Sequence, residues 1–125
     1  MNRGGKMSEQ TDGRKVVRTA HTPFGVYEWE PERTDISLLK LSFDHASGQG
    51  SYIMRMDPGA ETEWHTHARR EEYIILEGDL IEPDGTVLGP GDAVLFEPGT
   101  KHHSRTETGC LLFAVEYSLT GPGVS

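Results

Sequence analysis

Two histidines and a glutamate lie within one short stretch of the chain. His65 and His67 are separated by one residue, and Glu71 follows after three more. Imidazole nitrogens and carboxylate oxygens are the usual protein ligands of divalent transition metals. Side chains two apart in an extended strand point to the same side, so His65 and His67 can reach one ion together. The spacing therefore predicts a metal site.

Glu71 can join this pair only if the chain reverses direction after His67. In a continuous strand the four intervening steps would carry Glu71 about 13 Å away, at about 3.3 Å per residue. We therefore expect a hairpin whose strands, at 61–67 and 71–77, are joined by a short loop. Such pairing would place Glu71 near His67.

The same hairpin would place Tyr73 near His65, on the metal-binding side. A phenol in that position can donate a proton, accept one or orient a bound ligand. Tyr73 is therefore the candidate catalytic residue. The alternative role for this side chain is packing in the interior.

A second segment supplies another histidine. Residues 93–96 are typical of a strand, and Pro98 and Gly99 mark a turn before His102 and His103. Neighbouring residues in a strand point to opposite sides, so only one of these two histidines can face the first pair.

The two segments resemble the two motifs of the cupin superfamily. The first motif, with His-x-His, a glutamate and flanking glycines, is matched by Gly59, His65, His67, Glu71 and Gly78. The second is matched by Gly91, Gly99 and His102, while Glu97 and Thr106 replace a proline and an asparagine. The resemblance spans about Phe24 to Tyr117. It implies a jelly-roll β-barrel with a metal ion held by His65, His67, Glu71 and His102, and it favours His102 over His103.

Within the cupins, the chain looks most similar to the cupin domain of ChrR-type anti-sigma factors and to related stand-alone proteins. The segments that carry this likeness are Asp57–Ala60, Glu97–His102 and Thr108–Cys110.

Length and composition indicate one domain. The chain has 125 residues and 34% hydrophobic residues, enough to bury a core. Turn signals separate short strands throughout, which predicts an all-β sandwich or barrel. The strands are expected at about 24–29, 36–42, 50–56, 61–67, 71–77, 79–82, 86–88, 93–96, 101–105 and 110–117. We expect a disordered tail at 1–14, the barrel domain at 15–119 and a C-terminal tail at 120–125.

The charge balance and the single cysteine narrow the setting. Twelve basic and twenty acidic residues give a net charge of −8, which argues against nucleic acid and anionic membranes as partners. Cys110 cannot form an internal disulfide, and we expect it to be a buried apolar residue. The sequence shows no apolar run long enough for a membrane span and no signal peptide, so we expect a cytoplasmic protein.

Many cupins pair their N-terminal strand with a second subunit. The apolar pair Val16 and Val17 lies in a short expected strand, so residues 15–19 are the candidate dimer element. We expect a homodimer that binds a small molecule.

The function depends on the coordination of the ion. Zinc held tetrahedrally by all four ligands would be structural or sensory. Iron, manganese or nickel in an octahedral field would keep two positions for substrate or dioxygen. The first hypothesis is a metal-dependent dioxygenase acting on a small oxygen-rich molecule. The alternatives are a non-enzymatic metal- or ligand-sensing module and a metal-dependent lyase, since lyase cupins have a similar His-x-His-x3-Glu-x-Tyr run.

Overall fold

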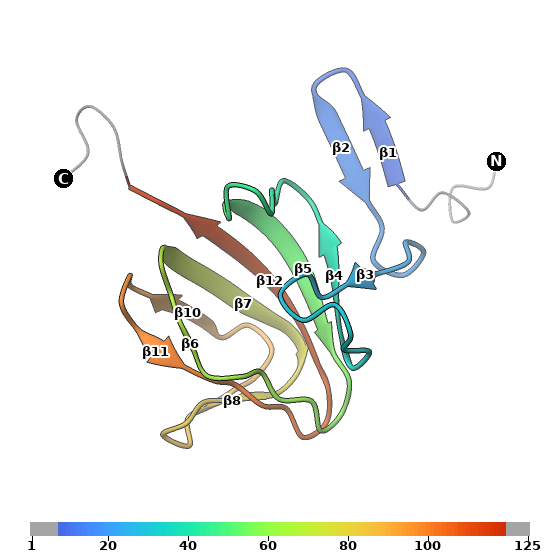
Figure 1. Ribbon diagram of the computed structural model, residues 1–125. Coiled ribbons are helices and arrows are strands. Elements are labelled where there is room, and N and C mark those ends of the chain that lie inside the picture. Colours follow the sequence, from blue (N-terminus) through green and yellow to red (C-terminus); the bar gives the residue numbers. More distant parts are fainter. Residues whose placement is uncertain (1–7, 120–125) are drawn as a thin grey trace.

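The computed structural model describes residues 8–119, and these residues form an all-β structure (Figure 1). No helix that could cross a membrane occurs among them. The strands are β1 (Ser8–Thr11), β2 (Arg14–Val17), β3 (Gly25–Val26), β4 (Ile36–Lys40), β5 (Gly50–Met56), β6 (His65–Thr66), β7 (Arg70–Gly78), β8 (Leu80–Ile81), β9 (Val87–Leu88), β10 (Ala93–Phe96), β11 (Lys101–His102) and β12 (Cys110–Tyr117).

A six-stranded antiparallel sheet forms the main layer. Its strand order is β10-β7-β12-β5-β4-β3. Strand β7 shows that one face of this sheet is buried and the other is exposed. Glu71, Tyr73 and Ile75 are buried, while Ile74 and Leu76 on the other face are 37% and 42% exposed. This alternation directs every second side chain into the interior.

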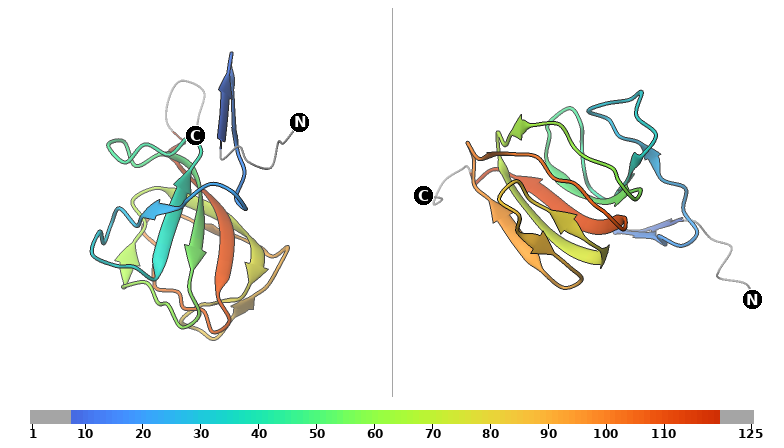
Figure 2. Two further views of the ribbon diagram at one scale, coloured as in Figure 1. Left: turned by 90° about the vertical axis from the view of Figure 1, so that its right-hand side faces the viewer. Right: turned by 90° about the horizontal axis from the view of Figure 1, so that it is seen from below.

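Two short antiparallel strand pairs, β6–β11 and β8–β9, form the facing layer (Figure 2). Arg105 links them, because it bridges to Glu61 on one side and to Ile81 on the other. The core lies between the layers and consists of the side chains Tyr27, Ile36, Leu38, Phe43, Tyr52, Met54, Met56, Ala60, Tyr73, Ile75, Leu80, Phe96, Cys110, Leu112 and Ala114. The residues between β5 and β12 therefore cross repeatedly from one layer to the other.

The hairpin expected between 61–67 and 71–77 is wrong. Strand β6 pairs with β11, and β7 pairs with β10 and β12. Backbone hydrogen bonds from His67 N to Thr100 O and from Gly99 N to His67 O continue the β6–β11 pairing. The chain then crosses to the main sheet, where the nine residues of β7 find long partners that the two-residue β6 cannot provide.

The N-terminal segment differs from the expected tail. Ser8–Thr11 forms β1, which pairs with β2 across a turn at Asp12 and Gly13, where Gly13 has a φ of 74°. The hairpin projects from the body of the protein (Figure 1). Residues 1–7 of the expected N-terminal tail and all of the expected C-terminal tail, 120–125, lie outside the described residues.

Cys110 begins β12 inside the core and is only 5% exposed. Burial raises the pKa of its thiol to about 12. The thiol therefore stays protonated at neutral pH and is a poor nucleophile. The expectation of a buried apolar residue is confirmed.

Candidate metal site

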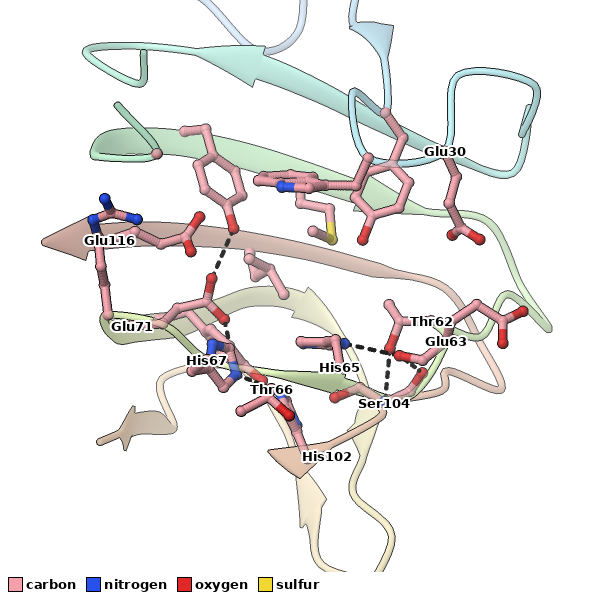
Figure 3. A pocket seen from close by; sticks show the side chains of 18 of the residues that line it. Glu30, Thr62, Glu63, His65, Thr66, His67, Glu71, His102, Ser104 and Glu116 are labelled. Carbon is pink, nitrogen blue, oxygen red and sulfur yellow. Dashed lines mark hydrogen bonds and ion pairs between the residues drawn. The ribbon is translucent and has the colours of Figure 1, made fainter. Parts of the chain in front are cut away.

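A pocket of about 480 Å³ opens between the two layers (Figure 3). Histidines, carboxylates and apolar side chains all line its wall. The apolar side chains include Met54, Met56, Leu80 and Leu112. The pocket thus places ionisable groups beside a surface suited to an uncharged part of a ligand.

Three histidines meet in this pocket. His65 and His102 are cross-strand partners in β6 and β11, and His67 follows β6 directly. The ligand nitrogens of the three rings all lie within 4.8 Å of one another. The structure therefore brings together three of the four predicted ligands, although through β6–β11 pairing and not through the expected hairpin.

Hydrogen bonds on the outer side of two rings fix which nitrogen faces the cluster. His65 Nδ1 lies 2.8 Å from the backbone oxygen of Glu63, and His102 Nδ1 lies 2.8 Å from a Glu82 oxygen. A carbonyl or carboxylate oxygen accepts hydrogen bonds only, so Nδ1 carries the proton in both rings. Each Nε2 then presents a lone pair, as a metal ligand must.

Burial keeps His67 uncharged. Burial, reinforced by the neighbouring His102 and His65, lowers the pKa of His67 to about 4. Phe96 stacks against this ring and against His102, with centroid distances of 5.1 and 4.1 Å. The His67 imidazole is thus neutral at neutral pH, and an aromatic side chain packs against it and against His102.

Glu71 lies beside His67 and belongs to a second group. Its Oε1 is 3.7 Å from His67 Nε2, and its Oε2 accepts a hydrogen bond of 3.0 Å from the Tyr52 hydroxyl. The ligand atoms of His67, Glu71 and Glu116 also lie within 4.8 Å of one another. The fourth predicted ligand therefore adjoins the three-histidine cluster through His67, and its coordination of an ion stays a prediction.

The two carboxyls of this second group hold protons more tightly than usual. Burial raises the pKa of Glu71 to about 8, with a further contribution from the charge of Glu116. Burial also raises the pKa of Glu116 to about 7, although Arg69 opposes the shift. Oε2 of Glu116 is buried and has no hydrogen-bond partner within residues 8–119.

Tyr73 lines the pocket but is not paired with His65 as expected. Its cross-strand partners are Val94 in β10 and Ala114 in β12. Its ring lies 5.5 Å from that of Phe96. Tyr73 therefore adjoins the cluster through Phe96, which stacks against His67 and His102.

The choice between the neighbouring histidines is clear in the structure. His102 is 5% exposed and belongs to the cluster. His103 points away, with Nδ1 3.2 Å from a Glu61 oxygen and its ring 4.4 Å from that of Trp64. The preference for His102 over His103 as the inward-facing residue is confirmed.

Sequence reasoning missed four polar residues around the site, namely Tyr52, Glu82, Ser104 and Glu116. Glu116 had a usable signal, because it shares strand parity with the buried Cys110, Leu112 and Ala114. An acid on the buried face of an apolar strand is unusual and points to a function. Glu82 lies just after a two-residue strand and gave no such signal.

The donor set fits a divalent metal ion. Nε2 of His67 and Nε2 of His102 are only 2.7 Å apart, and both side chains are buried. The Nε2 lone pair of His102 points toward His67. Ring nitrogens of three histidines that converge next to a carboxyl suit zinc, iron, manganese or nickel. The three-histidine cluster could therefore hold a metal ion.

Comparison with known proteins agrees with this geometry. The ChrR cupin-like domain family matches residues 15–120. The (R)-mandelonitrile lyase of Granulicella tundricola is 35% identical over 110 residues, which is 80% of each chain.

Solved structures show the same fold. An RmlC-like cupin from Shewanella frigidimarina has a TM-score of 0.66 at 20% identity and covers 89% of this chain and 93% of its own. The Rhodobacter sphaeroides complex of SigE with the anti-sigma factor ChrR has a TM-score of 0.58 at 16% identity. The match covers 68% of this chain and 46% of the other chain. Since the family match spans most of the described strands and the fold is that of the cupins, the chain belongs to the ChrR cupin-like family.

Proposed function

We propose that this protein is a metal-dependent lyase that cleaves a small hydroxylated molecule, with α-hydroxynitriles as the first substrate class to test. The observation that carries the proposal is the three-histidine cluster inside the pocket of a chain 35% identical to an (R)-mandelonitrile lyase. A lyase was among the alternatives that the metal-ligand motif indicated.

The pocket suits such a substrate. The polar side chains beside His67 can receive a hydroxyl group, and Met54 and Leu112, which line the same pocket, can contact an alkyl or aromatic group. Burial of the apolar group would stabilise the complex by about 25 cal/mol per Å².

The reaction requires one proton acceptor and one leaving anion. The hydroxyl of the α-hydroxynitrile loses its proton, the bond to the nitrile carbon breaks, and its electron pair leaves with cyanide, which then takes up a proton. A divalent ion bound at His65, His67 and His102 would supply a Lewis acid that lowers the pKa of the hydroxyl. Glu116, whose pKa is about 7, is partly ionised at neutral pH and is the proposed base.

Tyr73 remains the proposed catalytic hydroxyl, with a narrower role. Burial raises its pKa well above 10, so the phenol stays protonated at neutral pH. It can donate a hydrogen bond but cannot serve as the base. A catalytic hydroxyl predicts that Tyr73→Phe lowers turnover by about 10²–10⁴-fold with unchanged metal content, whereas a packing role predicts unchanged turnover.

The test uses purified protein loaded in turn with iron, zinc, manganese and nickel. Mandelonitrile is added, and aldehyde absorbance and cyanide release are followed with the spontaneous rate subtracted. We expect release that depends on metal and is lost in His67→Ala. Release no faster than in buffer with every metal would reject the lyase, and elemental analysis of protein purified without a metal-affinity tag would identify the resident ion.

A second candidate is a non-enzymatic sensor of metal or ligand. The observation in its favour is membership of the family named for the ChrR cupin-like domain. A protein that holds one ion tightly and turns over no substrate would support this candidate. The dioxygenase hypothesis stays a prediction, to be tested by oxygen consumption with diketone-like substrates.

We also propose a homodimer in which the β1–β2 hairpin contacts a second subunit. Val16 and Val17 in β2 are partly exposed, and the apolar side chains Ile74, Leu76 and Leu95 are exposed on the outer face of the main sheet. Light scattering should give twice the chain mass, and deletion of residues 1–20 should weaken association. A monomer for the full-length chain would reject the dimer.

A further inference from the structure

We propose that Glu82 is a positioning residue that holds His102 in the tautomer and orientation needed to bind the metal ion. The inference rests on the metal site of the proposed function and is independent of the reaction catalysed there.

Glu82 is a buried carboxylate with two hydrogen-bond donors. Its side chain is 10% exposed, and that of His102 is 6% exposed. One oxygen accepts from His102 Nδ1 at 2.8 Å, and the other accepts from the Ser104 hydroxyl. A buried carboxylate is costly unless its oxygens are paired, so this arrangement satisfies both oxygens at once.

The backbone on both sides of this contact is fixed. Glu82 N donates to Thr86 O at 2.9 Å, and Gly85 N donates back to Glu82 O at 2.9 Å, which closes a tight turn. The preceding residue, Ile81, exchanges two backbone hydrogen bonds with Arg105, close in sequence to His102 and Ser104. Glu82 is therefore held against the histidine-bearing segment.

The contact decides which ring nitrogen of His102 can bind a metal. Because a carboxylate only accepts, Nδ1 carries the proton and Nε2 carries the lone pair. That Nε2 lies 2.7 Å from His67 Nε2, inside the cluster. A carboxylate on the outer nitrogen also increases the basicity of a metal-bound imidazole, and loss of such a partner typically lowers metal affinity by about 10–100-fold.

His65 provides an internal comparison. Its Nδ1 donates to a backbone oxygen, that of Glu63, at 2.8 Å. No substitution of a side chain removes that acceptor. In His102, by contrast, the outer nitrogen is hydrogen-bonded to a replaceable side chain.

Ser104 pairs with the second oxygen of the same carboxylate. The Ser104 hydroxyl donates to the Glu82 oxygen that His102 does not use. Backbone and side-chain bonds to Thr62 hold Ser104 in place, with Ser104 N donating to Thr62 Oγ1 at 2.9 Å. The three side chains therefore form one hydrogen-bonded row, Ser104–Glu82–His102.

The first arm of the test needs no variant and no metal. Long-range ¹⁵N–¹H spectra of the metal-free wild-type protein distinguish the two neutral tautomers of each histidine. We expect His102 to carry its proton on Nδ1. A proton on Nε2 of His102 would overturn the proposal, and this readout decides even if every Glu82 variant fails to fold.

The second arm titrates metal-free protein with Co²⁺ against a competing chelator. Glu82→Gln keeps the shape and removes the charge, so we expect affinity to fall by about 10–100-fold, with a larger loss in Glu82→Ala. Ser104→Ala should change it by less than about threefold, because the His102–Glu82 bond remains. Glu61→Gln is the matched control, since Glu61 is a glutamate beside the non-ligand His103.

Wild-type affinity in a folded Glu82→Gln, or failure of the wild-type protein to bind Co²⁺, would overturn the proposal. Failure of the lyase alone has a different signature. In that case no cyanide is released from mandelonitrile, while the Co²⁺ affinities still separate Glu82→Gln from Glu61→Gln, and the positioning role of Glu82 stands.

Discussion

Two groups of side chains share His67 in one pocket, and they differ in how complete they are without an ion. The three-histidine cluster of His65, His67 and His102 has an outer acceptor for two of its rings. The second group contains the carboxyls of Glu71 and Glu116. One of its oxygens, Oε2 of Glu116, has no hydrogen-bond partner among the described residues.

The charge state explains the difference. Burial lowers the pKa of His67 to about 4, so the ring needs no counter-ion at neutral pH. Burial raises the pKa of Glu71 to about 8 and that of Glu116 to about 7, so these carboxyls resist ionisation until a cation is near. The three histidines come together without an ion, whereas the two carboxyls would ionise only when a cation is near.

The largest effect should come from the residue common to both groups. His67→Ala removes a ligand and the contact to Glu71, so we expect stoichiometric metal binding to be abolished. Elemental analysis of the purified variant measures this loss.

His21→Ala and His45→Ala are the matched controls and should keep a full equivalent of metal. Nδ1 of His45 lies 3.0 Å from a Glu28 oxygen, and the His45 side chain is 52% exposed. His45 belongs to neither group. A full equivalent of metal in His67→Ala would show that the ion is bound elsewhere.

The sequence was informative where chemistry depends on local spacing. His65 and His67 were identified by their separation, and His102 by its distance from Gly99. Strands β5, β10 and β12 occur where alternation and turn residues predicted them, because those signals act over a few residues. The cupin fold predicted from the motifs is confirmed.

The sequence was uninformative where pairing is decided at long range. Nothing near β6 shows that it pairs with β11, because the choice depends on which partner completes each layer. The contact between Glu82 and His102 joins residues 20 positions apart, from two different strand pairs of the facing layer. Such contacts have no periodic signature in a single sequence.

Removing the metal should destabilise the protein, and more so at higher pH. The folded pKa of Glu71, about 8, exceeds the ordinary value of 4.5, so metal-free stability falls as pH rises toward 8. The lowered pKa of His67 acts only below pH 6.5, where stability falls on acidification. Between pH 6.5 and 8 only the carboxyl effect operates.

We therefore expect the melting temperature to drop on chelation, with a gap that widens from pH 6.5 to 8. At a metal concentration about 100 times Kd, bound metal adds about 2.7 kcal/mol, or roughly 10 °C. Thermal melts with and without chelator measure the gap. A gap that narrows toward pH 8 would mean that the ion does not offset the charge of Glu71.

A smaller effect should show whether Glu71 is a ligand. At pH 7 its carboxyl is largely protonated in the metal-free protein, so coordination must release that proton. Calorimetry in buffers of different ionisation enthalpy should show this proton for the wild-type protein and none for Glu71→Gln, whose affinity should be about tenfold weaker.

Glu72→Gln is the control, because Glu72 follows Glu71 in β7 and faces outward. It should release the same number of protons as the wild-type protein. Unchanged proton release and affinity in Glu71→Gln would remove Glu71 from the ligand set and leave three histidines.

The smallest effect on stability and metal affinity should come from Glu116, which is grouped with His67 and Glu71 and not with the three histidines. Ionising Glu116 in the metal-free protein is unfavourable, because its folded pKa of about 7 lies above 4.5. The cost grows as pH rises from 4.5 to 7 and is then constant. Glu116→Gln removes the charge and keeps the shape, so it should stabilise the metal-free protein at pH 8 by about 1 kcal/mol after allowance for partial solvent exposure. Well below pH 4.5, where the carboxyl is protonated in both states, the variant and the wild-type protein should melt at the same temperature. Co²⁺ affinity should stay within a few-fold of the wild-type value, while mandelonitrile cleavage should fall if Glu116 is the base. A variant that is less stable at pH 8 than the wild-type protein would show that the attraction between Glu116 and Arg69 outweighs the cost of burying the charge.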